Sequence, residues 1–110
     1  MDIVYKNAKV DLTTTNVTTV LTVGSTTKKE AAIIKSILVS EDSNNADTIT
    51  LTITNTADDV FSLFKDKAIS AKATSELLSA PLILGAGEIL KATAATGGRL
   101  HIVVSYMETS

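Results

Sequence analysis

The segment DTITLTIT, residues 47–54, alternates between hydroxyl and apolar side chains from its second position onward. In an extended chain, Ile49, Leu51 and Ile53 fall on one side, and the threonines fall on the other. Isoleucine and threonine are β-branched, so their side chains suit a pleated strand better than a helix. The pattern therefore predicts a β-strand with one buried face.

Comparable segments occur along the whole chain of 110 residues, separated by clusters of turn-forming residues. The segment 99–107 alternates in the same way, with Tyr106 on its apolar side. The segment 31–40 is apolar on both faces, which is typical of a central strand. We expect residues 95–98 to close the last hairpin. The other segments predicted as strands are 8–12, 17–23, 60–65, 67–72 and 75–79.

This spacing of turns predicts an all-β fold, namely a small antiparallel β-sandwich or jelly roll of about eight strands. The length predicts a single domain over residues 1–110, in which residues 1–7 could form an N-terminal arm. Residues 58–78 also fit a helix, because Phe61 and Phe64 lie at helical spacing. We favour strands there, since the second half of the segment alternates, and keep the helix as the alternative.

The segment LGAGEI contains Gly85 and Gly87 between two apolar runs, which raises the question of a phosphate-binding loop. A dinucleotide-binding loop needs a third glycine where this chain has Leu90, and a P-loop needs Gly-Lys-Ser/Thr at its end. We therefore interpret the glycines as a tight turn joining two strands, and we expect no cofactor.

Candidate catalytic and metal-binding residues are scarce. The chain has no cysteine and a single histidine, His101, which no nucleophile motif accompanies. We interpret His101 as a surface or interface residue. The acidic loop 42–47 departs from the EF-hand pattern at Ala46 and Asp47. Solvated turn charges are the favoured interpretation, with an irregular calcium site as the alternative, so we expect no enzymatic activity and no metal.

The charge and hydropathy exclude two classes of partner. The net charge is −2 and no cluster of lysine and arginine stands out, whereas nucleic-acid binding needs concentrated positive charge. The apolar runs are only a few residues long, too short to span a membrane. We therefore expect no nucleic acid and no membrane among the partners.

Four stretches together resemble the small virion structural proteins of tailed bacteriophages, particularly phages of marine bacteria and cyanobacteria. They are YKNAKVDLTTTNVTTVLTV, IIKSILVSEDSNNADTITLTIT, LFKDKAISAKATSELLSAPLILGAGEILKATA and LHIVVSYME, and they extend from Tyr5 to Glu108. The resemblance implies a β-sandwich or jelly roll present in many copies on the virion, assembled in the host cytoplasm. It implies a capsid decoration (cement) protein or a neck or tail component, and it brings no active-site residues.

The implied partners are further copies of the chain, in a homo-oligomer such as a trimer, and the major capsid protein or neck and tail proteins. Aromatic residues are favoured anchors of interfaces, and the chain has only four. The residues that we expect at an interface are Tyr5, Lys28, Lys29 and Tyr106. Tyr5 could belong to a docking arm or to an ordinary first strand packed in its own domain. A carbohydrate- or ligand-binding β-sandwich is the alternative from another class, although the chain has no tryptophan.

Overall fold

The structure, a computed structural model, describes residues 3–24 and 31–109. These residues form nine β-strands and no helix, and hence no helix that could cross a membrane. The prediction of an all-β fold is confirmed. In chain order the strands are β1 (Ile3–Leu12), β2 (Thr18–Thr22), β3 (Ala31–Glu41), β4 (Asp47–Thr54), β5 (Val60–Ile69), β6 (Thr74–Glu76), β7 (Leu82–Leu84), β8 (Ile89–Ala94) and β9 (Leu100–Thr109).

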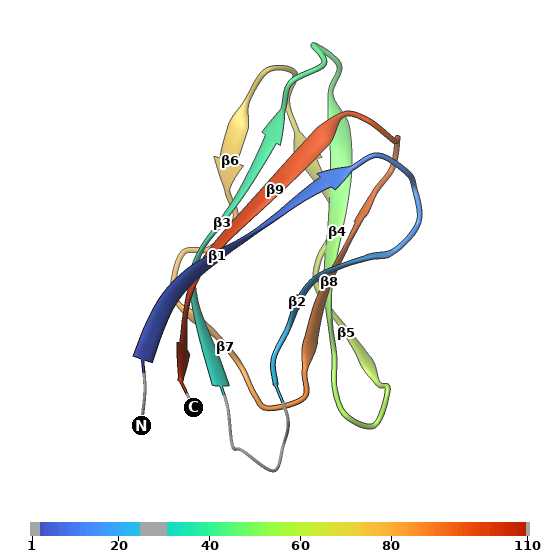
Figure 1. Cartoon of the computed structure of the whole chain (residues 1–110). Helices are drawn as coiled ribbons and strands as arrows, with labels where there is room; N and C mark the ends of the chain where they lie inside the picture. The colour runs from blue at the N-terminus through green and yellow to red at the C-terminus, as the bar shows by residue number, and fades with distance from the viewer. Residues whose placement is uncertain (1–2, 25–30, 110) are drawn as a thin grey trace.

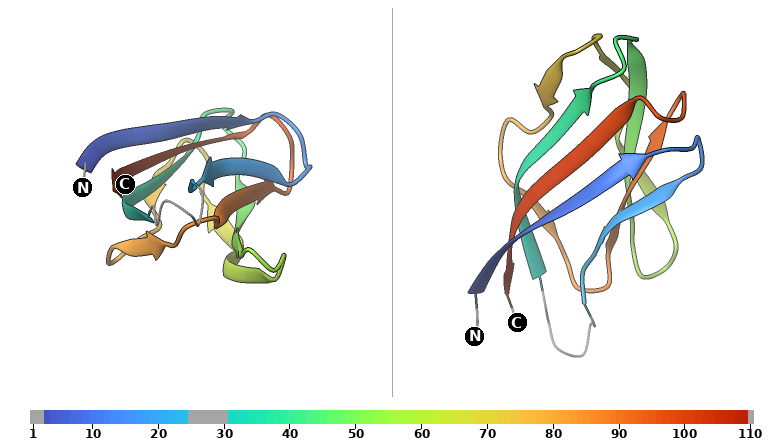
Figure 2. Two further views of the ribbon diagram at one scale, coloured as in Figure 1. Left: turned by 60° about the horizontal axis from the view of Figure 1, so that its bottom comes forward. Right: turned by 45° about the horizontal axis from the view of Figure 1, so that its top comes forward.

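The strands form two antiparallel sheets stacked face to face (Figure 1, Figure 2). Sheet A has the order β1-β9-β3-β6, with β7 also paired to β3, and sheet B has the order β2-β8-β4-β5. Strands β6 and β7 pair with different parts of β3, residues 38–40 and 32–34, so they share one position in sheet A. Most successive strands lie in opposite sheets, and two sheets of four positions connected in this way form a jelly roll.

The hydrophobic core lies between the two sheets and follows from the alternation of side chains along the strands. On β4, Ile49 and Leu51 are fully buried, and Leu100, Ile102 and Val104 on β9 are fully buried as well. Burial of each such side chain contributes about 1.5–3 kcal/mol to folding. The predicted apolar faces of both segments are thus confirmed as core faces.

Strand β5 lies in the segment for which a helix was the alternative. A single strand, Val60–Ile69, replaces the two predicted strands 60–65 and 67–72. Its register against β4 shifts on either side of Leu51, and each shift inserts an extra residue on β5. Asp66, between the two halves, has a φ of 52°. These bulges disturb the period of two, which explains why the segment did not show a simple strand pattern.

The predicted tight turn at Gly85 and Gly87 is confirmed, and it connects β7 in sheet A to β8 in sheet B. Gly87 has a φ of 79° and donates its N–H to the Gly24 carbonyl at 2.8 Å. The Gly85 N–H donates to the Glu88 side chain at 2.6 Å, and the Glu88 N–H donates to the Gly85 carbonyl at 3.1 Å. These N–H groups, which a phosphate-binding loop would direct at its ligand, are bonded within the protein.

Residues 95–98 do not close a hairpin, contrary to the prediction. Strand β8 lies in sheet B and β9 in sheet A, so the segment crosses from one sheet to the other. It packs against the β1–β2 connection, where the Gly98 N–H donates to the Leu12 carbonyl at 2.9 Å. A Cβ atom on Gly97 would lie 2.5 Å from the Thr13 carbonyl oxygen. Gly97 therefore allows a close contact between the two crossing connections.

The two glycines should respond differently to asparagine, which tolerates positive φ better than most residues. Gly97→Asn should lower the free energy of unfolding by about 1–3 kcal/mol, because its side chain overlaps the backbone of Thr13. Gly98→Asn should cost less, at most about 1 kcal/mol, because no atom lies within 4 Å of a Cβ there and only the strain of a φ of 81° remains. Urea unfolding of both variants measures the difference. Equal losses would show that the crossing contact is unimportant.

Candidate functional site

The outer face of sheet A, the face turned away from the core, carries a row of apolar side chains that crosses four strands. Tyr5 on β1 lies opposite Met107 on β9, Met107 lies opposite Ile33 on β3, and Ile33 lies opposite Ile83 on β7. Tyr5 is 77% exposed and Ile83 is 66% exposed. The four residues, which we call the apolar row, lie at the end of sheet A that carries both chain termini (Figure 1).

A second apolar contact lies further along the same face. Val103 on β9 is opposite Leu38 on β3, and Leu38 is 39% exposed. Lys9 on β1 and Glu76 on β6 flank this pair in the register. The outer face of sheet A thus alternates apolar positions with a few polar ones.

The outer face of sheet B differs, because it consists largely of hydroxyl groups. Thr50 on β4 lies opposite Thr93 on β8, and Thr52 lies opposite Lys91. Their neighbours Ile49 and Leu51 point into the core. Hydroxyl and amino groups bind water readily, so this central part of the face can stay hydrated, and the exposed apolar residues of sheet B, Val60 and Phe61, lie on its edge strand β5.

His101 lies on the outer face of sheet A, at the end away from the apolar row. Its Nε2 is 3.2 Å from Asp11 Oδ1, and its Nδ1 is 3.3 Å from Asp42 Oδ2. Ser40 lies opposite His101 in the register. A histidine that activates a serine needs one ring nitrogen free to accept the hydroxyl proton. Both nitrogens here face carboxylates, so the arrangement links β1 to the loop after β3 rather than forming a nucleophile–base pair.

Glu41, at the end of β3, is a buried carboxylate that is only 2% exposed. It accepts hydrogen bonds from the Ser43 N–H at 2.7 Å, the Lys72 N–H at 2.9 Å and the Asn45 N–H at 3.2 Å, and from the Ser43 hydroxyl. Burial acts to raise the pKa of this carboxyl, but the hydrogen bonds outweigh it and lower the pKa from 4.5 to about 2. Glu41 thus joins the loop after β3 to the β5–β6 connection.

Glu76 has a similar role in attaching β6 to β3. It accepts hydrogen bonds from the Ile37 N–H at 2.8 Å, the Leu78 N–H at 3.3 Å and the Ser36 hydroxyl. Burial opposes ionisation here too, yet these bonds lower the pKa of Glu76 below its usual value. Both glutamates therefore have a structural explanation.

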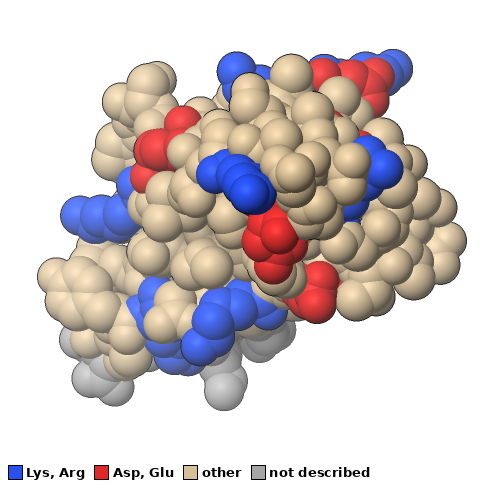
Figure 3. All heavy atoms as spheres, turned by 90° about the horizontal axis from the view of Figure 1, so that it is seen from above, with Lys and Arg blue, Asp and Glu red and all other residues tan. Residues whose placement is uncertain are grey.

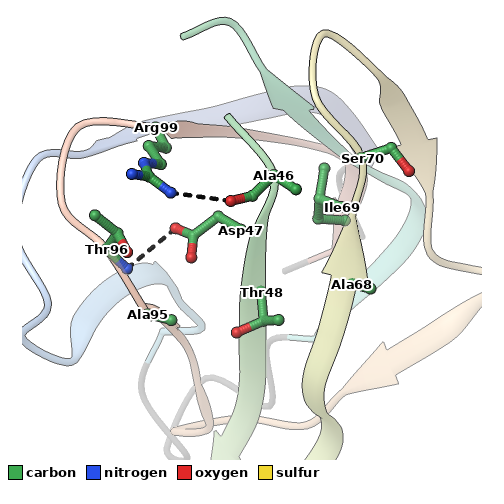
Figure 4. A pocket seen from close by; sticks show the side chains of 9 residues that line it. All are labelled: Ala46, Asp47, Thr48, Ala68, Ile69, Ser70, Ala95, Thr96 and Arg99. Carbon is green, nitrogen blue, oxygen red and sulfur yellow. Dashed lines mark hydrogen bonds between the residues drawn. The ribbon is translucent and has the colours of Figure 1, made fainter. Parts of the chain in front are cut away.

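A shallow depression of about 340 Å³ opens between β4, β5 and the 95–99 segment (Figure 4). The Thr96 N–H donates to Asp47 Oδ2 at 3.1 Å, and Arg99 donates to the Ala46 carbonyl at 3.0 Å. The charged side chains of this depression thus hold its walls together.

Across residues 3–24 and 31–109, no group of three or more His, Cys, Asp or Glu side chains is arranged to hold a metal ion.

The structure places the residues predicted at an interface in different environments. Tyr5 belongs to β1, paired with β9, so residues 3–7 form part of sheet A, yet its ring stays on the exposed outer face. Tyr106 is 8% exposed and packs in the core, which leaves little of it for a partner. Lys28 and Lys29 lie outside the described residues. Sequence reasoning missed the other members of the apolar row, because their alignment depends on which strands pair.

Charged residues of both signs are interspersed with uncharged surface on the end of the molecule seen in Figure 3. Lysine and arginine side chains gather at the lower left of this view, whereas the aspartate and glutamate side chains lie elsewhere on the same face.

No known protein family and no curated protein matches this sequence. Among solved structures, the fold is similar to part of a chain that contains the CBM22-1 and GH10 modules of endo-1,4-β-D-xylanase 10B from Clostridium thermocellum, determined in complex with xylohexaose. The identity is 12% and the TM-score is 0.43, and the match covers 96% of this chain and 24% of the xylanase chain. A similarity at this level carries no functional argument.

The Glu41 network predicts a defined dependence of stability on pH. Because the folded-state pKa is about 2 and the ordinary value is 4.5, the carboxylate stabilises the fold above pH 4.5. That contribution should be lost as the pH falls from 4.5 to about 2. Glu41→Gln should unfold at a lower denaturant concentration than the wild type at pH 7 and show a flatter pH profile in this range.

Denaturant unfolding at several pH values measures both effects. Asp59→Asn, which removes an exposed carboxylate, is the matched control and should retain the wild-type profile. A Glu41→Gln variant with the wild-type midpoint and slope would contradict the structural role of this carboxylate.

Proposed function

We propose that this chain is a structural protein of a tailed-bacteriophage particle, acting as a capsid decoration (cement) protein. In this proposal copies associate with one another, and the outer face of sheet A binds the shell. The observation that carries the proposal is the apolar row, which crosses sheet A from β1 to β7.

The apolar row has the properties of a protein-binding surface. Exposed apolar side chains grouped in this way mark interaction sites on soluble domains. Tyr5 adds an aromatic ring at 77% exposure, and tyrosine is enriched among the residues that dominate binding energy. Covering one such side chain fully is worth about 1.5–3 kcal/mol. A row of four therefore offers a useful binding energy to a shell subunit.

The contrast between the two outer faces supports the orientation proposed here. Sheet B presents Thr50, Thr52, Thr93 and Lys91, which remain hydrated at no cost. Sheet A presents a row of apolar groups across its strands that gains free energy when covered, whereas the exposed apolar residues of sheet B, Val60 and Phe61, are confined to its edge strand β5. A decoration protein with sheet A on the shell and sheet B toward the medium satisfies both faces.

The role of the acidic residues is compatible with a non-enzymatic protein. Glu41, Glu76 and Asp47 accept N–H groups of neighbouring segments, and both nitrogens of His101 face carboxylates. The hydrogen bonds and close polar contacts of these side chains hold neighbouring loops and strands together. Jelly rolls occur in viral capsids and in lectins alike, so the fold itself supports this proposal only by analogy.

The experiment compares Ile83→Ser with Val60→Ser in virions of the phage that encodes the chain. The two side chains are matched in exposure, at 66% and 63%, but Val60 lies on β5 in sheet B. Ile83→Ser should weaken attachment about tenfold or more, because about 2 kcal/mol of apolar burial is lost. Val60→Ser should attach like the wild type, and both free proteins should keep the wild-type melting temperature.

Quantitative mass spectrometry of purified virions gives the copy number for each variant. Hundreds of wild-type copies per particle are expected for a decoration protein, whereas a dozen or fewer would indicate a neck or tail component. Absence from the particle, or specific binding on a glycan array, would reject the proposal in favour of a ligand-binding module.

A further inference from the structure

The four edges of the two sheets differ in how well they are protected against pairing with another strand. Strand β2 is five residues long and has a register shift, and β5 has two register shifts. The edge formed by β6 and β7 consists of two pieces of three residues each, with Pro81 directly before the second. Short strands, bulges and proline are devices by which proteins block edge-to-edge association.

Strand β1 is neither short, nor bulged, nor interrupted by proline, and Lys6 and Lys9 are the charges on it that could oppose pairing. It is ten residues long, and its register with β9 runs without a shift from Ile3 to Leu12. Its first residues are apolar and exposed, at 54% for Ile3, 47% for Val4 and 77% for Tyr5. A long, regular edge with exposed apolar side chains is a template for a further strand.

The backbone groups available on this edge can be identified. In an antiparallel ladder, a residue that bonds to one neighbour directs both its N–H and its C=O toward that neighbour, and the next residue directs them away. The Leu12 carbonyl accepts the Gly98 N–H on the β9 side. Even-numbered residues of β1 therefore bond to β9, and odd-numbered residues, including Tyr5, Asn7 and Lys9, direct their N–H and C=O groups outward.

We propose that the free edge of β1 binds β1 of a second copy of this chain, antiparallel, around a two-fold axis at Asn7. The interaction continues sheet A of one copy into sheet A of the other. It takes from the proposed function only the expectation that copies of the chain associate.

The side chains of β1 are complementary to themselves in this register. Tyr5 lies opposite Lys9 of the second copy, where the ammonium group can contact the aromatic ring. Val4 lies opposite Val10 of the second copy, which is half-buried against its own core. Lys6 forms an ion pair with Glu108 at 2.9 Å and lies opposite Ala8 of the second copy, so no like charges meet.

Two-fold axes at the neighbouring residues of β1 give less favourable pairings than the axis at Asn7. A two-fold axis at Lys6 would place the two Lys6 residues opposite each other. An axis at Ala8 would place Val4 opposite Leu12, which is already buried, with 1% exposure. An axis at Tyr5 would leave only residues 3–7 of each described strand to pair. The axis at Asn7 pairs residues 3–11 without like charges opposite each other and, unlike the axis at Ala8, includes the exposed Ile3.

The first test uses a proline on the outward-facing backbone. Asn7→Pro removes an N–H that points away from β9, so the native ladder keeps its bonds while the dimer loses the two central ones, one from each copy. Asn7→Ala retains the N–H and is the matched control. In sedimentation velocity over a concentration series, the wild type and Asn7→Ala should form a dimer, and Asn7→Pro should stay monomeric with an unchanged far-UV circular dichroism spectrum.

The second test determines the register by disulfide cross-linking. Because the chain has no cysteine, a cysteine introduced at one position can form a disulfide only with the same position of a second copy. Directly opposite residues in a hydrogen-bonded pair have Cα atoms about 5.5 Å apart, within the range of roughly 4.4–6.8 Å that a disulfide needs. Asn7→Cys should therefore form a disulfide-linked dimer under mild oxidation. Tyr5→Cys should not, because the two cysteines would lie roughly 14 Å apart along the strands.

A wild type that is monomeric at every concentration, a trimer, or a dimer that Asn7→Pro leaves intact would each overturn the β1 interaction. Efficient linkage of Tyr5→Cys with none of Asn7→Cys would overturn the register. These outcomes are independent of the copy number in virions, so a protein that is abundant in particles but monomeric in solution would reject this inference alone.

Discussion

The hydrogen-bonded position of β9 between β1 and β3 is the constraint on which the rest of the structure depends. One side of β9 supplies Leu100, Ile102 and Val104 to the core, so the residues between them must lie on the outer face. That face brings His101 beside Asp11 at one end and Met107 between Tyr5 and Ile33 at the other. A slip of one residue would exchange the two faces completely. The core and the proposed binding surface are therefore consequences of one register.

The fold class could be predicted from the sequence because alternation is a local property. DTITLTIT shows its buried face within eight residues, and β4 occupies the same range, Asp47–Thr54. Strand pairing is not local. The segment 95–98 looks like a hairpin turn, and only the opposite sheets of β8 and β9 identify it as a crossing. The apolar row was missed for the same reason, since Ile33, Ile83 and Met107 come from three distant segments. Tyr106 showed the core pattern, but its aromatic character suggested an interface.

The carboxylates illustrate a different limit. In the sequence, the loop after β3 could hold solvated charges or a calcium ion, because both use aspartate and glutamate in a turn. In the fold, Glu41 meets the N–H groups of Asn45 and Lys72, and Asp47 meets the N–H of Thr96. Such carboxylates accept hydrogen bonds from loop N–H groups that have no backbone carbonyl as a partner. A buried N–H group must be bonded, so these side chains stabilise the loops. The low pKa of Glu41 follows from this structural role.

The edge of β1 and the apolar row can act together, because they use groups that point in perpendicular directions. The edge engages N–H and C=O groups in the plane of sheet A, whereas Tyr5 and Ile83 project from that plane. A dimer formed through β1 would present two apolar rows on one continuous outer face. Two weak contacts held on one rigid body bind with higher avidity than either alone, provided that the shell offers two matching sites. A particle surface built from repeated subunits offers such pairs, so self-association through the edge would strengthen attachment through the face.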